Sequence, residues 1–491
     1  MRILFVVNRL AHARHFDRAL RLLADRGHDV CLASQDDDVE LWGVLAKQPR
    51  IRAIVAPRNR GDDWSAAATM VRRARDYIRY LHPRYASANL LRERAFEKMV
   101  GSVSDSAETL GPEWSELLRR VPKTDQKRLD VLLAKLETAI PSDPDIGEFL
   151  TAQRPDVLVL SPMVGIGFTQ ADFVKSARLL GIPSGMLVFS WDNLSNKGLI
   201  HEMPDRVWVW NDTQMREAVK LHKCPPERIV ITGAPRFDEF FEMQPASTRA
   251  EFCQLAGLDP ARPIITYLGS SKFVAAAEQA FVTRWIAALR GSSDPVLAGA
   301  SLLVRPHPAG EKNWHADGSV DVRWPKVGEK ATVSRPFGDD RAIVMNSPMQ
   351  NADVVLYDTV HHSAAIVGLN TSAEIEAAIV GRPVFTILDS NAQGQQGTLH
   401  FHYLLRQRGG HVELAESFDQ HTAQLSDALA GKYRRDAIDE FVQRFVRPHG
   451  LNVPVAPRLA DAIEALAATH ATAIGRETDS VRLKPDTTGV V

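Results

Sequence analysis

Short runs of hydrophobic residues alternate with amphipathic segments along most of the chain. Residues 3–7 form an all-apolar run, residues 16–26 follow with helical periodicity, and a second apolar run begins at residue 30. Strands of a parallel sheet carry such unbroken apolar runs because helices cover both faces of the sheet. The alternation therefore predicts βαβ units and an α/β fold.

The alternation falls into two series. A chain of 491 residues exceeds what one hydrophobic core organises, so two α/β domains are expected. We predict a first Rossmann-like domain over residues 1–240 and a second over 250–445, facing a central cleft. The predicted strands lie at residues 3–7, 30–33, 51–56, 156–160, 184–189, 206–210, 228–232, 264–268, 302–304, 342–345, 364–368 and 383–388.

Residues 62–144 interrupt this rhythm. Their composition is helical and rich in arginine, so we predict a helical insertion in the first domain. One interpretation of the basic stretch 71–98 is a platform for phosphate or lipid headgroups, which would make any membrane contact peripheral. The interleaved Asp76, Glu93 and Glu97 instead favour an ordinary solvated helix face.

Composition excludes several classes of function. The net charge is −1, which argues against nucleic acid as a partner. Cys31, Cys224 and Cys253 are scattered without metal-binding spacing, which fits a reducing cytoplasm. We expect no metal ion and no bound cofactor. No apolar run reaches the about 18 residues of a membrane-spanning helix.

The strongest candidate chemistry lies in residues 368–384, which predict a strand end, a polar turn and a short helix. Thr371 and Ser372 suit the start of the helix, where free N–H groups and the helix dipole favour phosphate. Glu376 lies one turn further on and can accept hydrogen bonds from ribose hydroxyls. We therefore predict a nucleoside diphosphate site at Asn370, Thr371, Ser372 and Glu376. An ordinary crossover helix is the alternative.

Two further polar turns follow predicted strands of the second domain. Gly269, Ser270 and Ser271 are small enough to let a phosphate approach their N–H groups. Arg305 suits bidentate phosphate binding, and the flanking Pro306 and Pro308 would hold His307 in place. Because ligands of doubly wound domains bind at the carboxyl ends of strands, we expect all three turns to line one site.

In the first domain, a polar loop follows the strand at 184–189. Trp191 offers a stacking face for a sugar or base, and Asp192 is a candidate general base. Asn193 and Lys197 are candidates for binding hydroxyl or phosphate groups. A capped turn anchored by the tryptophan is the alternative interpretation.

Two other first-domain positions carry candidate chemistry. His15 follows the first strand and is a second candidate base, although it equally suits the polar end of a helix. Arg236 follows the strand at 228–232 and is a phosphate candidate, while Asp238 suits a helix cap.

The order of these motifs resembles that of GT-B glycosyltransferases. Glu-Ala-x-x-x-Gly-x-Pro at 376–383 is similar to their donor-site signature, and many of them place a histidine base where His15 stands. The turn at 269–271 resembles that of octulosonic acid transferases. Arg-Pro-His-Pro resembles turns of glycerophosphotransferases and nonhydrolysing UDP-N-acetylglucosamine epimerases. One position departs from the pattern, because Ala234 replaces an asparagine of related turns.

The resemblance, over roughly residues 1–60 and 150–445, implies a metal-independent glycosyltransferase of cell-envelope polysaccharide or glycolipid synthesis. It would be cytoplasmic and would move sugar from a nucleotide sugar to a saccharide or lipid-linked acceptor. An epimerase, a glycerophosphotransferase and a non-catalytic nucleotide-sugar-binding protein stay open. The resemblance also implies that helices at 436–446 and 458–468 pack back across the first domain, with 446–474 as the returning segment. We expect a disordered tail at 475–491.

Overall fold

The computed structural model describes residues 1–482 except 38, 59, 105–112, 167–169, 272, 273, 276, 308–313, 315–318, 325–329, 347–351 and 389–399. The chain divides into two compact units. Unit 1 comprises Met1–Pro83, Leu91–Asp238 and the segment from Arg447 onward, and unit 2 comprises Arg84–Leu90 and Glu239–Val446. The structure places the boundary between the units after Asp238, whereas the predicted boundary lay between residues 240 and 250.

Unit 1 is built on a seven-stranded sheet in the order β3-β2-β1-β4-β5-β6-β7. Each pairing between neighbouring strands is parallel, as the alternation predicted. The strands are β1 (Arg2–Val7), β2 (Asp29–Ser34), β3 (Ile51–Val55), β4 (Val157–Ser161), β5 (Ser184–Leu187), β6 (Arg206–Val209) and β7 (Ile229–Ile231).

Both faces of this sheet are covered, which explains the unbroken apolar runs. Ile3 and Phe5 pack on one side with residues of α1 (Asp17–Asp25) and of the C-terminal helix α18 (Val455–Arg482). Leu4 packs on the other side with residues of α6 (Pro144–Gln153) and α7 (Gln170–Leu179). Successive side chains of β1 therefore enter two different cores. A further helix, α9 (Asp212–His222), lies between β6 and β7 in the chain.

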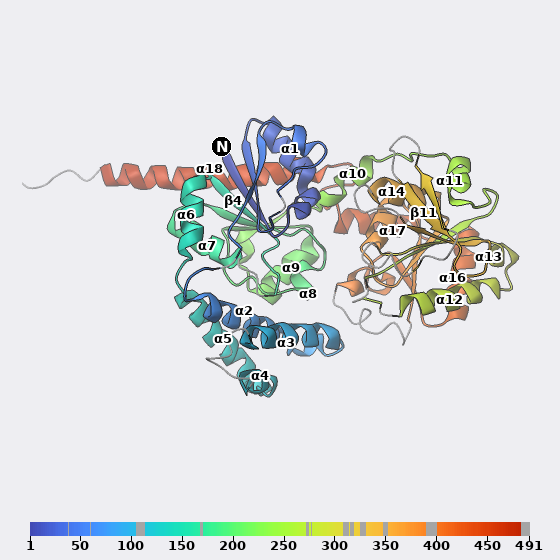
Figure 1. Ribbon diagram of the computed structural model, residues 1–491, viewed down its shortest axis with the longest axis horizontal. Helices are drawn as coiled ribbons and strands as arrows, with labels where there is room; N and C mark the ends of the chain where they lie inside the picture. The colour runs from blue at the N-terminus through green and yellow to red at the C-terminus, as the bar shows by residue number, and fades with distance from the viewer. Residues whose placement is uncertain are drawn as a thin grey trace, which may run out of the picture. The chain divides into compact units, whose positions relative to one another are not determined.

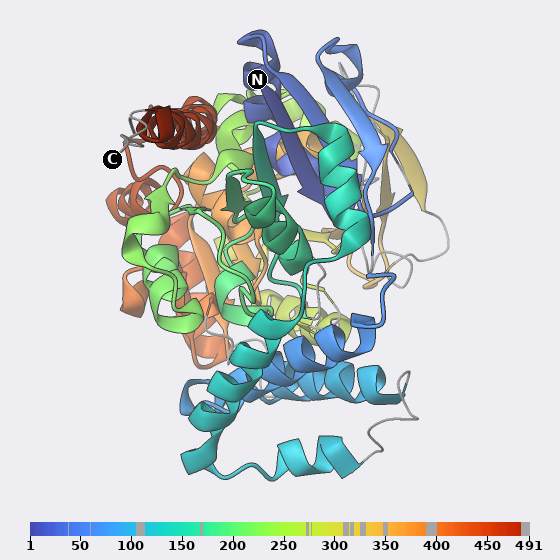
Figure 2. The ribbon, with the colours of Figure 1, turned by 90° about the vertical axis from the view of Figure 1, so that its left-hand side faces the viewer.

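The predicted helical insertion is present in unit 1. Its helices are α2 (Ser65–Tyr80), α3 (Asn89–Ser104), α4 (Glu113–Arg119) and α5 (Lys123–Ala139), and Figures 1 and 2 show them grouped at one end of the unit. A buried ion network joins α2 and α5 to α7, one of the helices that cover the sheet. The Arg72 guanidinium contacts Glu137 at 2.8 Å and Asp172 at 2.7 Å, and Lys175 contacts Glu137 at 2.9 Å.

Three arginines of the basic stretch 71–98 make contacts inside unit 1. Arg72 is buried in that network, and Arg75 pairs with Asp130 at 3.2 Å. Arg79 donates to backbone carbonyls, as described below. All three arginines lie on α2, and they make internal contacts of unit 1 because this helix packs on α5. No helix in the described part of the chain is long and apolar enough to cross a membrane.

Unit 2 is built on an eight-stranded sheet in the order β10-β11-β12-β9-β8-β13-β14-β15. The pairings of β11 with β10 and with β12 are antiparallel, and the other pairings are parallel. The antiparallel edge was not predicted. The strands are β8 (Ile264–Leu268), β9 (Ser301–Arg305), β10 (Val320–Arg323), β11 (Lys330–Ser334), β12 (Ala342–Asn346), β13 (Ala365–Gly368), β14 (Val384–Ile387) and β15 (Val412–Ala415).

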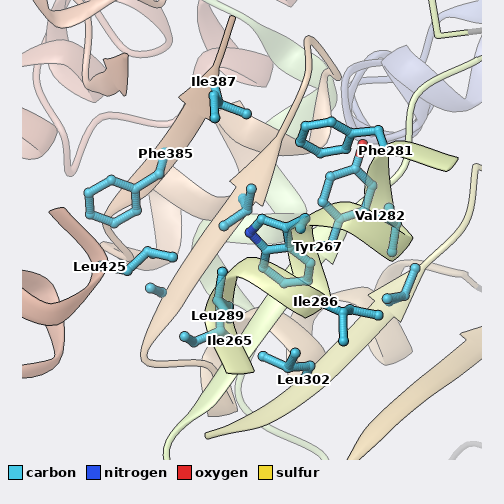
Figure 3. Close-up of a cluster of buried hydrophobic side chains, with 14 of the residues drawn as sticks. Ile265, Tyr267, Phe281, Val282, Ile286, Leu289, Leu302, Phe385, Ile387 and Leu425 are labelled. Atoms are coloured by element: carbon cyan, nitrogen blue, oxygen red, sulfur yellow. The ribbon is translucent and has the colours of Figure 1, made fainter. Parts of the chain in front are cut away.

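The main core of unit 2 combines aliphatic side chains with a few large aromatic ones (Figure 3). The Tyr267 ring on β8 lies 5.9 Å from Phe281 and 5.7 Å from Trp285, both on α12. The packing fixes α12 against the central strands. The helices of this unit include α11 (Arg249–Ala256), α12 (Glu278–Arg290), α14 (Ala352–His362), α15 (Ala373–Val380), α16 (Phe418–Leu429) and α17 (Arg435–Phe445).

Only one of the two late helices belongs to unit 1. α18 buries Leu459 and Ile463 in the unit 1 core, as expected for a returning helix (Figure 1). The prediction for residues 436–446 was wrong, because α17 stays in unit 2, where Phe441 packs 4.5 Å from the His411 ring. α18 also continues to Arg482, past the predicted start of the tail. Residues 483–491 lie outside the described residues.

Candidate functional site

The three polar turns of unit 2 meet at one edge of its sheet. The turns at Gly269, Arg305 and Asn370 follow β8, β9 and β13, and the sheet order places β8 between the other two. The Gly269 N–H donates to the Arg305 carbonyl at 2.8 Å. The Ser270 hydroxyl donates to the Asn370 carbonyl at 3.5 Å. The structure therefore brings together the residues that the sequence assigned to a nucleotide site.

Close packing explains the glycine in the first of these turns. A Cβ atom at Gly269 would lie 2.7 Å from the His307 nitrogen and 3.0 Å from the Arg305 carbonyl oxygen. Any other residue would push the two turns apart. Burial lowers the pKa of His307, so its imidazole is neutral at pH 7. Pro308, which was expected to stiffen this turn, lies outside the described residues.

Two charged side chains at this edge are withdrawn from water. Arg305 and Glu376 are each only 8% exposed. A buried arginine and a buried glutamate beside small polar turns suit a ligand that carries both phosphate and hydroxyl groups, because charge-assisted hydrogen bonds are stronger in such surroundings. Among the residues that the structure describes, no group of three or more His, Cys, Asp or Glu side chains is placed to hold a metal ion.

The helix predicted after Asn370 is present as α15, and Gly381 ends it in the left-handed conformation, with φ 79°. Its start differs from the prediction. The Ser372 side chain does not cap the helix. Instead, Glu374 Oε1 accepts the N–H groups of Asn370 at 3.0 Å and Thr371 at 3.3 Å. These two N–H groups were expected to bind phosphate, and an internal carboxyl group holds them. The next N–H groups also have internal acceptors: Ala373 N–H donates to Thr371 Oγ1 at 3.5 Å, Glu374 N–H to the Thr371 carbonyl at 3.2 Å and Ile375 N–H to the Ser372 carbonyl at 3.0 Å. An anion at this helix would therefore compete with these contacts.

A second glutamate holds the neighbouring turn in the same way. Glu278 on α12 accepts the Ser270 N–H at 2.7 Å and the Tyr267 hydroxyl at 2.9 Å, both through Oε1. Burial raises the pKa of Glu278 to about 7, against the opposing effect of these hydrogen bonds. The sequence analysis identified neither contact. Ser270 and Glu278 are eight residues apart, and Asn370 and Glu374 are four residues apart. The sequence alone does not show that a hydrogen bond joins the two residues of each pair.

In unit 1, His15 lies in a short 3-10 helix (Leu10–Phe16) directly after β1. Its ring stacks on Phe189, which follows β5, with centroids 5.1 Å apart. The pKa of His15 is well below its ordinary value because the ring is buried, and because the cationic Arg236 acts on it. His15 is therefore neutral at pH 7, and the same surroundings disfavour its protonated form. The structure thus brings His15 and Arg236 together at the carboxyl edge of the sheet.

The loop after Phe189 contains the short helix α8 (Asn193–Asn196) and presents Asp192. Asp192 Oδ1 accepts the Ser190 hydroxyl at 2.7 Å, and Oδ2 lies 3.2 Å from the Lys197 ammonium. The side chain of Asp192 stays 20% exposed and the side chain of Lys197 stays 37% exposed. A carboxylate and an ammonium group are therefore both accessible on this loop.

Two predicted ligand-binding residues of this loop are structural. Trp191 is 3% exposed, so its indole offers no open stacking face. Asn193 is buried, and its Oδ1 accepts the N–H groups of Phe189 and Ser190, each at 3.2 Å. The amide therefore closes the turn after β5. The alternative interpretation, a capped turn anchored by the tryptophan, describes these two positions correctly.

The helical insertion holds this loop in place. Arg79 Nη1 donates to the carbonyls of Lys197 at 2.9 Å and Gly198 at 2.8 Å, and Nη2 donates to the Leu194 carbonyl. The Tyr80 hydroxyl also donates to the Lys197 carbonyl, at 2.8 Å. A guanidinium group and a phenol thus bind carbonyls at the end of α8, which the sequence did not reveal.

Asp238 caps a helix, although a distant one. Its Oδ2 accepts the N–H groups of Val455 at 2.8 Å and Ala456 at 2.7 Å, and its Oδ1 accepts from Arg447 at 2.7 Å. The carboxylate therefore stabilises the start of α18. The neighbouring Arg236 packs its guanidinium 4.8 Å from the Phe237 ring centroid.

No protein-family model and no curated protein matches the sequence. Solved structures do match. A UDP-GlcNAc 2-epimerase from Methanocaldococcus jannaschii is 10% identical, with a TM-score of 0.49, over 95% of this chain and 100% of that one. A glycosyltransferase from Rickettsia africae is 10% identical, with a TM-score of 0.48, over 95% and 98%. WaaG, a glycosyltransferase involved in lipopolysaccharide biosynthesis, is 13% identical, with a TM-score of 0.46, over 94% and 99%.

These likenesses are weak, and neither a family nor an activity of this chain follows from them. Independently of any comparison, the chain itself contains two units, each with a mostly parallel sheet and polar turns at the carboxyl ends of its strands.

Proposed function

We propose that the protein is a glycosyltransferase that takes a sugar from a nucleotide-diphosphate sugar. One observation carries the proposal: three turns of unit 2, at the ends of β8, β9 and β13, meet at one edge of the sheet, where buried Arg305 ends β9 and where α15, which contains buried Glu376, begins. The carboxyl edge of a doubly wound sheet is where such domains bind their ligands. We name this group of residues the donor half-site: Gly269, Ser270, Ser271, Arg305, His307, Asn370, Thr371, Ser372 and Glu376.

In the donor half-site, each part of a nucleotide sugar has a suitable partner. Arg305 would bind the diphosphate through its fork of N–H donors, with the hydroxyls of Ser270 and Ser271 beside it. The start of α15 adds a positive dipole worth up to about 2 kcal/mol in a partly buried site. Glu376 lies within the first turns of the same helix and would accept the ribose hydroxyls.

In the proposed reaction, an acceptor hydroxyl attacks the anomeric carbon of the sugar, and the bond between that carbon and the diphosphate oxygen breaks. The electron pair of that bond leaves with the nucleoside diphosphate. Its growing negative charge is stabilised by Arg305 and the helix start, which is the larger catalytic contribution in such transfers. The proton of the acceptor hydroxyl goes to a general base.

Two groups of unit 1 qualify as that base. Asp192 is partly exposed and lies beside the Lys197 ammonium, which stabilises its charged form. His15 is neutral because it is buried, and it lies close to Arg236. In this proposal the acceptor is a saccharide or a lipid-linked saccharide, bound near Asp192, Lys197 and Arg236.

A panel of nucleotide sugars tests the proposal against the three alternatives. The purified protein is incubated with each donor, with and without a glycolipid extract, and the products are separated by ion-exchange chromatography and identified by NMR. Release of nucleoside diphosphate with sugar added to the extract supports glycosyl transfer. An epimerised donor indicates a nonhydrolysing epimerase, and an unchanged donor that nevertheless binds indicates a non-catalytic protein. Turnover only with a glycerophosphate donor, such as CDP-glycerol, indicates a glycerophosphotransferase.

A further inference from the structure

A buried carboxyl group lies beneath the donor half-site, and the proposed reaction does not use it. Glu374 is 0% exposed, and its Oε1 accepts the N–H groups of Asn370 and Thr371. Its Oε2 is also buried and has no hydrogen-bond partner within the described part of the chain. One oxygen therefore holds the turn, while the other has unmet hydrogen-bonding capacity.

The backbone around Glu374 is shaped to admit this carboxyl group. A Cβ atom on Gly368, the last residue of β13, would lie 2.6 Å from Glu374 Oε1, so a larger residue there would displace the carboxyl group from the turn. Asn370 adopts φ 115°, a conformation that residues other than glycine rarely take. Such strain persists only where surrounding contacts hold it, and the N–H bond from Asn370 to Glu374 is one of them.

No cation compensates this carboxyl group among the residues that the structure describes. The charged groups packed on α15 lie away from it: Arg435 of α17 donates to the Gly381 carbonyl at the far end, and Arg382 donates to the His361 carbonyl. Burial raises the pKa of Glu374 to about 7, while the two backbone hydrogen bonds lower it. No charged side chain contributes to the shift.

We propose that Glu374 is a positioning residue of the donor half-site, which fixes the Asn370–Thr371 turn and takes up a proton when an anionic nucleotide sugar binds. This inference rests on the proposed function. A diphosphate at the start of α15 would place negative charge near a buried carboxyl group, and their repulsion in a medium of low dielectric favours the protonated acid. The protonated group keeps one oxygen as an acceptor and gains a hydrogen to donate.

Proton uptake makes the affinity depend on pH in a defined direction. At a pH below the pKa that Glu374 has in the unliganded protein, the carboxyl group is already protonated, and the affinity does not depend on pH. Above it, binding must first capture a proton, so the affinity falls as the pH rises, by at most about tenfold per pH unit for one proton. The affinity therefore begins to fall near pH 7 and continues to fall until the pH reaches the pKa of Glu374 in the complex.

Calorimetric titration of the full chain tests this inference, with UDP-glucose, UDP-N-acetylglucosamine, GDP-mannose and CDP-glycerol as probes. These diphosphate diesters are suitable because they lack a terminal phosphate that titrates near pH 6. For wild type, we expect affinity to fall several-fold between about pH 6.5 and about pH 8.5, with proton uptake that appears as a dependence on buffer ionisation heat. Glu374→Gln keeps an acceptor oxygen for the turn, so it should bind with nearly pH-independent affinity. Glu374→Ala should bind weakly throughout.

Three outcomes would overturn the inference. One is a wild-type protein that binds a probe with the same affinity over the whole range. A second is a pH dependence that persists in Glu374→Gln but disappears in Glu278→Gln, which would assign the proton to the other buried carboxyl group. The third is a Glu374→Ala variant that binds as tightly as wild type, because the turn would then not need Glu374.

Absence of binding by all probes at every pH would contradict the proposed function instead, and the position of Glu374 can still be tested. The ordinary pKa of a glutamate is 4.5 and that of Glu374 is raised to about 7. The folded chain therefore keeps a proton that the unfolded chain has lost, and the stability from this group falls as the pH rises from 4.5 to about 7. Glu374→Gln should lack this part of the pH dependence of unfolding. An unchanged profile would overturn the inference without reference to a ligand.

Discussion

At the scale of single residues, the donor half-site depends on charges that are held out of water. Arg305 and Glu376 are buried at the edge of the unit 2 sheet, where neighbouring turns are joined by short backbone contacts. A hydrogen bond to a charged group contributes about 1.5–3 kcal/mol, roughly twice the value for neutral partners. Substitution of Arg305 or Glu376 should therefore weaken ligand binding more than substitution of an exposed residue does.

Glu376→Ala should weaken nucleoside diphosphate binding by about tenfold or more, because one or two charge-assisted bonds to ribose are lost. Calorimetry with a panel of nucleoside diphosphates measures the change. The exposed Glu416→Ala serves as the control, since it removes the same group from the surface of the same unit. Equal affinities of wild type and Glu376→Ala would remove Glu376 from the site.

Asp192→Asn separates the base from the binding machinery. The asparagine keeps the shape of the side chain and can still accept the Ser190 hydroxyl, but it cannot take a proton from an acceptor. Turnover should fall by about a hundredfold or more, while nucleotide affinity stays nearly unchanged. If turnover holds and the corresponding His15→Gln variant is inactive, the proton goes to His15. Loss of nucleotide affinity in Asp192→Asn would instead make Asp192 a binding or structural group.

At the scale of elements, α2 determines the position of the Asp192 loop. Its Arg79 binds three carbonyls at the end of α8. Arg79→Ala should lower turnover by about tenfold to a hundredfold, since a displacement of about 1 Å at a reacting group has an effect of that size. Nucleotide affinity, which the proposed function assigns to unit 2, should not change. The exposed Arg128→Ala on α5 is the matched control. Unchanged turnover in Arg79→Ala would show that the loop does not need α2.

Elements were easier to predict from sequence than the contacts between them. The parallel strands follow from unbroken apolar runs, and α15 follows from Ser372 and Gly381 at its ends. The site residues were identified by type and by their position after strands. The sequence could not show that Trp191 is buried or that Arg79 points into the protein, because both depend on how distant helices pack. For the same reason, the sequence could not show that Glu374 accepts the N–H groups of the turn before its helix.

At the scale of the whole molecule, α18 belongs to unit 1, while the preceding helix α17 belongs to unit 2. Leu459 of α18 is fully buried in the unit 1 core, and Leu302 of β9 is fully buried in the unit 2 core. Each unit has its own sheet and its own set of helices. Removal of a large side chain from one core should therefore act on that unit alone.

Leu459→Ala and Leu302→Ala form a matched pair that tests this independence. Each substitution should destabilise its own unit by about 2–5 kcal/mol, through lost burial and the cavity that remains. Native-state hydrogen exchange read by mass spectrometry locates the effect. Leu459→Ala should raise the exchange of peptides from β1 and α1 and leave β8 and β13 unchanged, and Leu302→Ala should do the reverse. If either variant raises exchange equally in both units, they unfold as one, and a substitution in the donor half-site could then alter the Asp192 loop through stability alone. If the units are independent, a loss of nucleotide affinity in Glu376→Ala can be assigned to unit 2. A loss of turnover in Arg79→Ala can then be assigned to the Asp192 loop of unit 1.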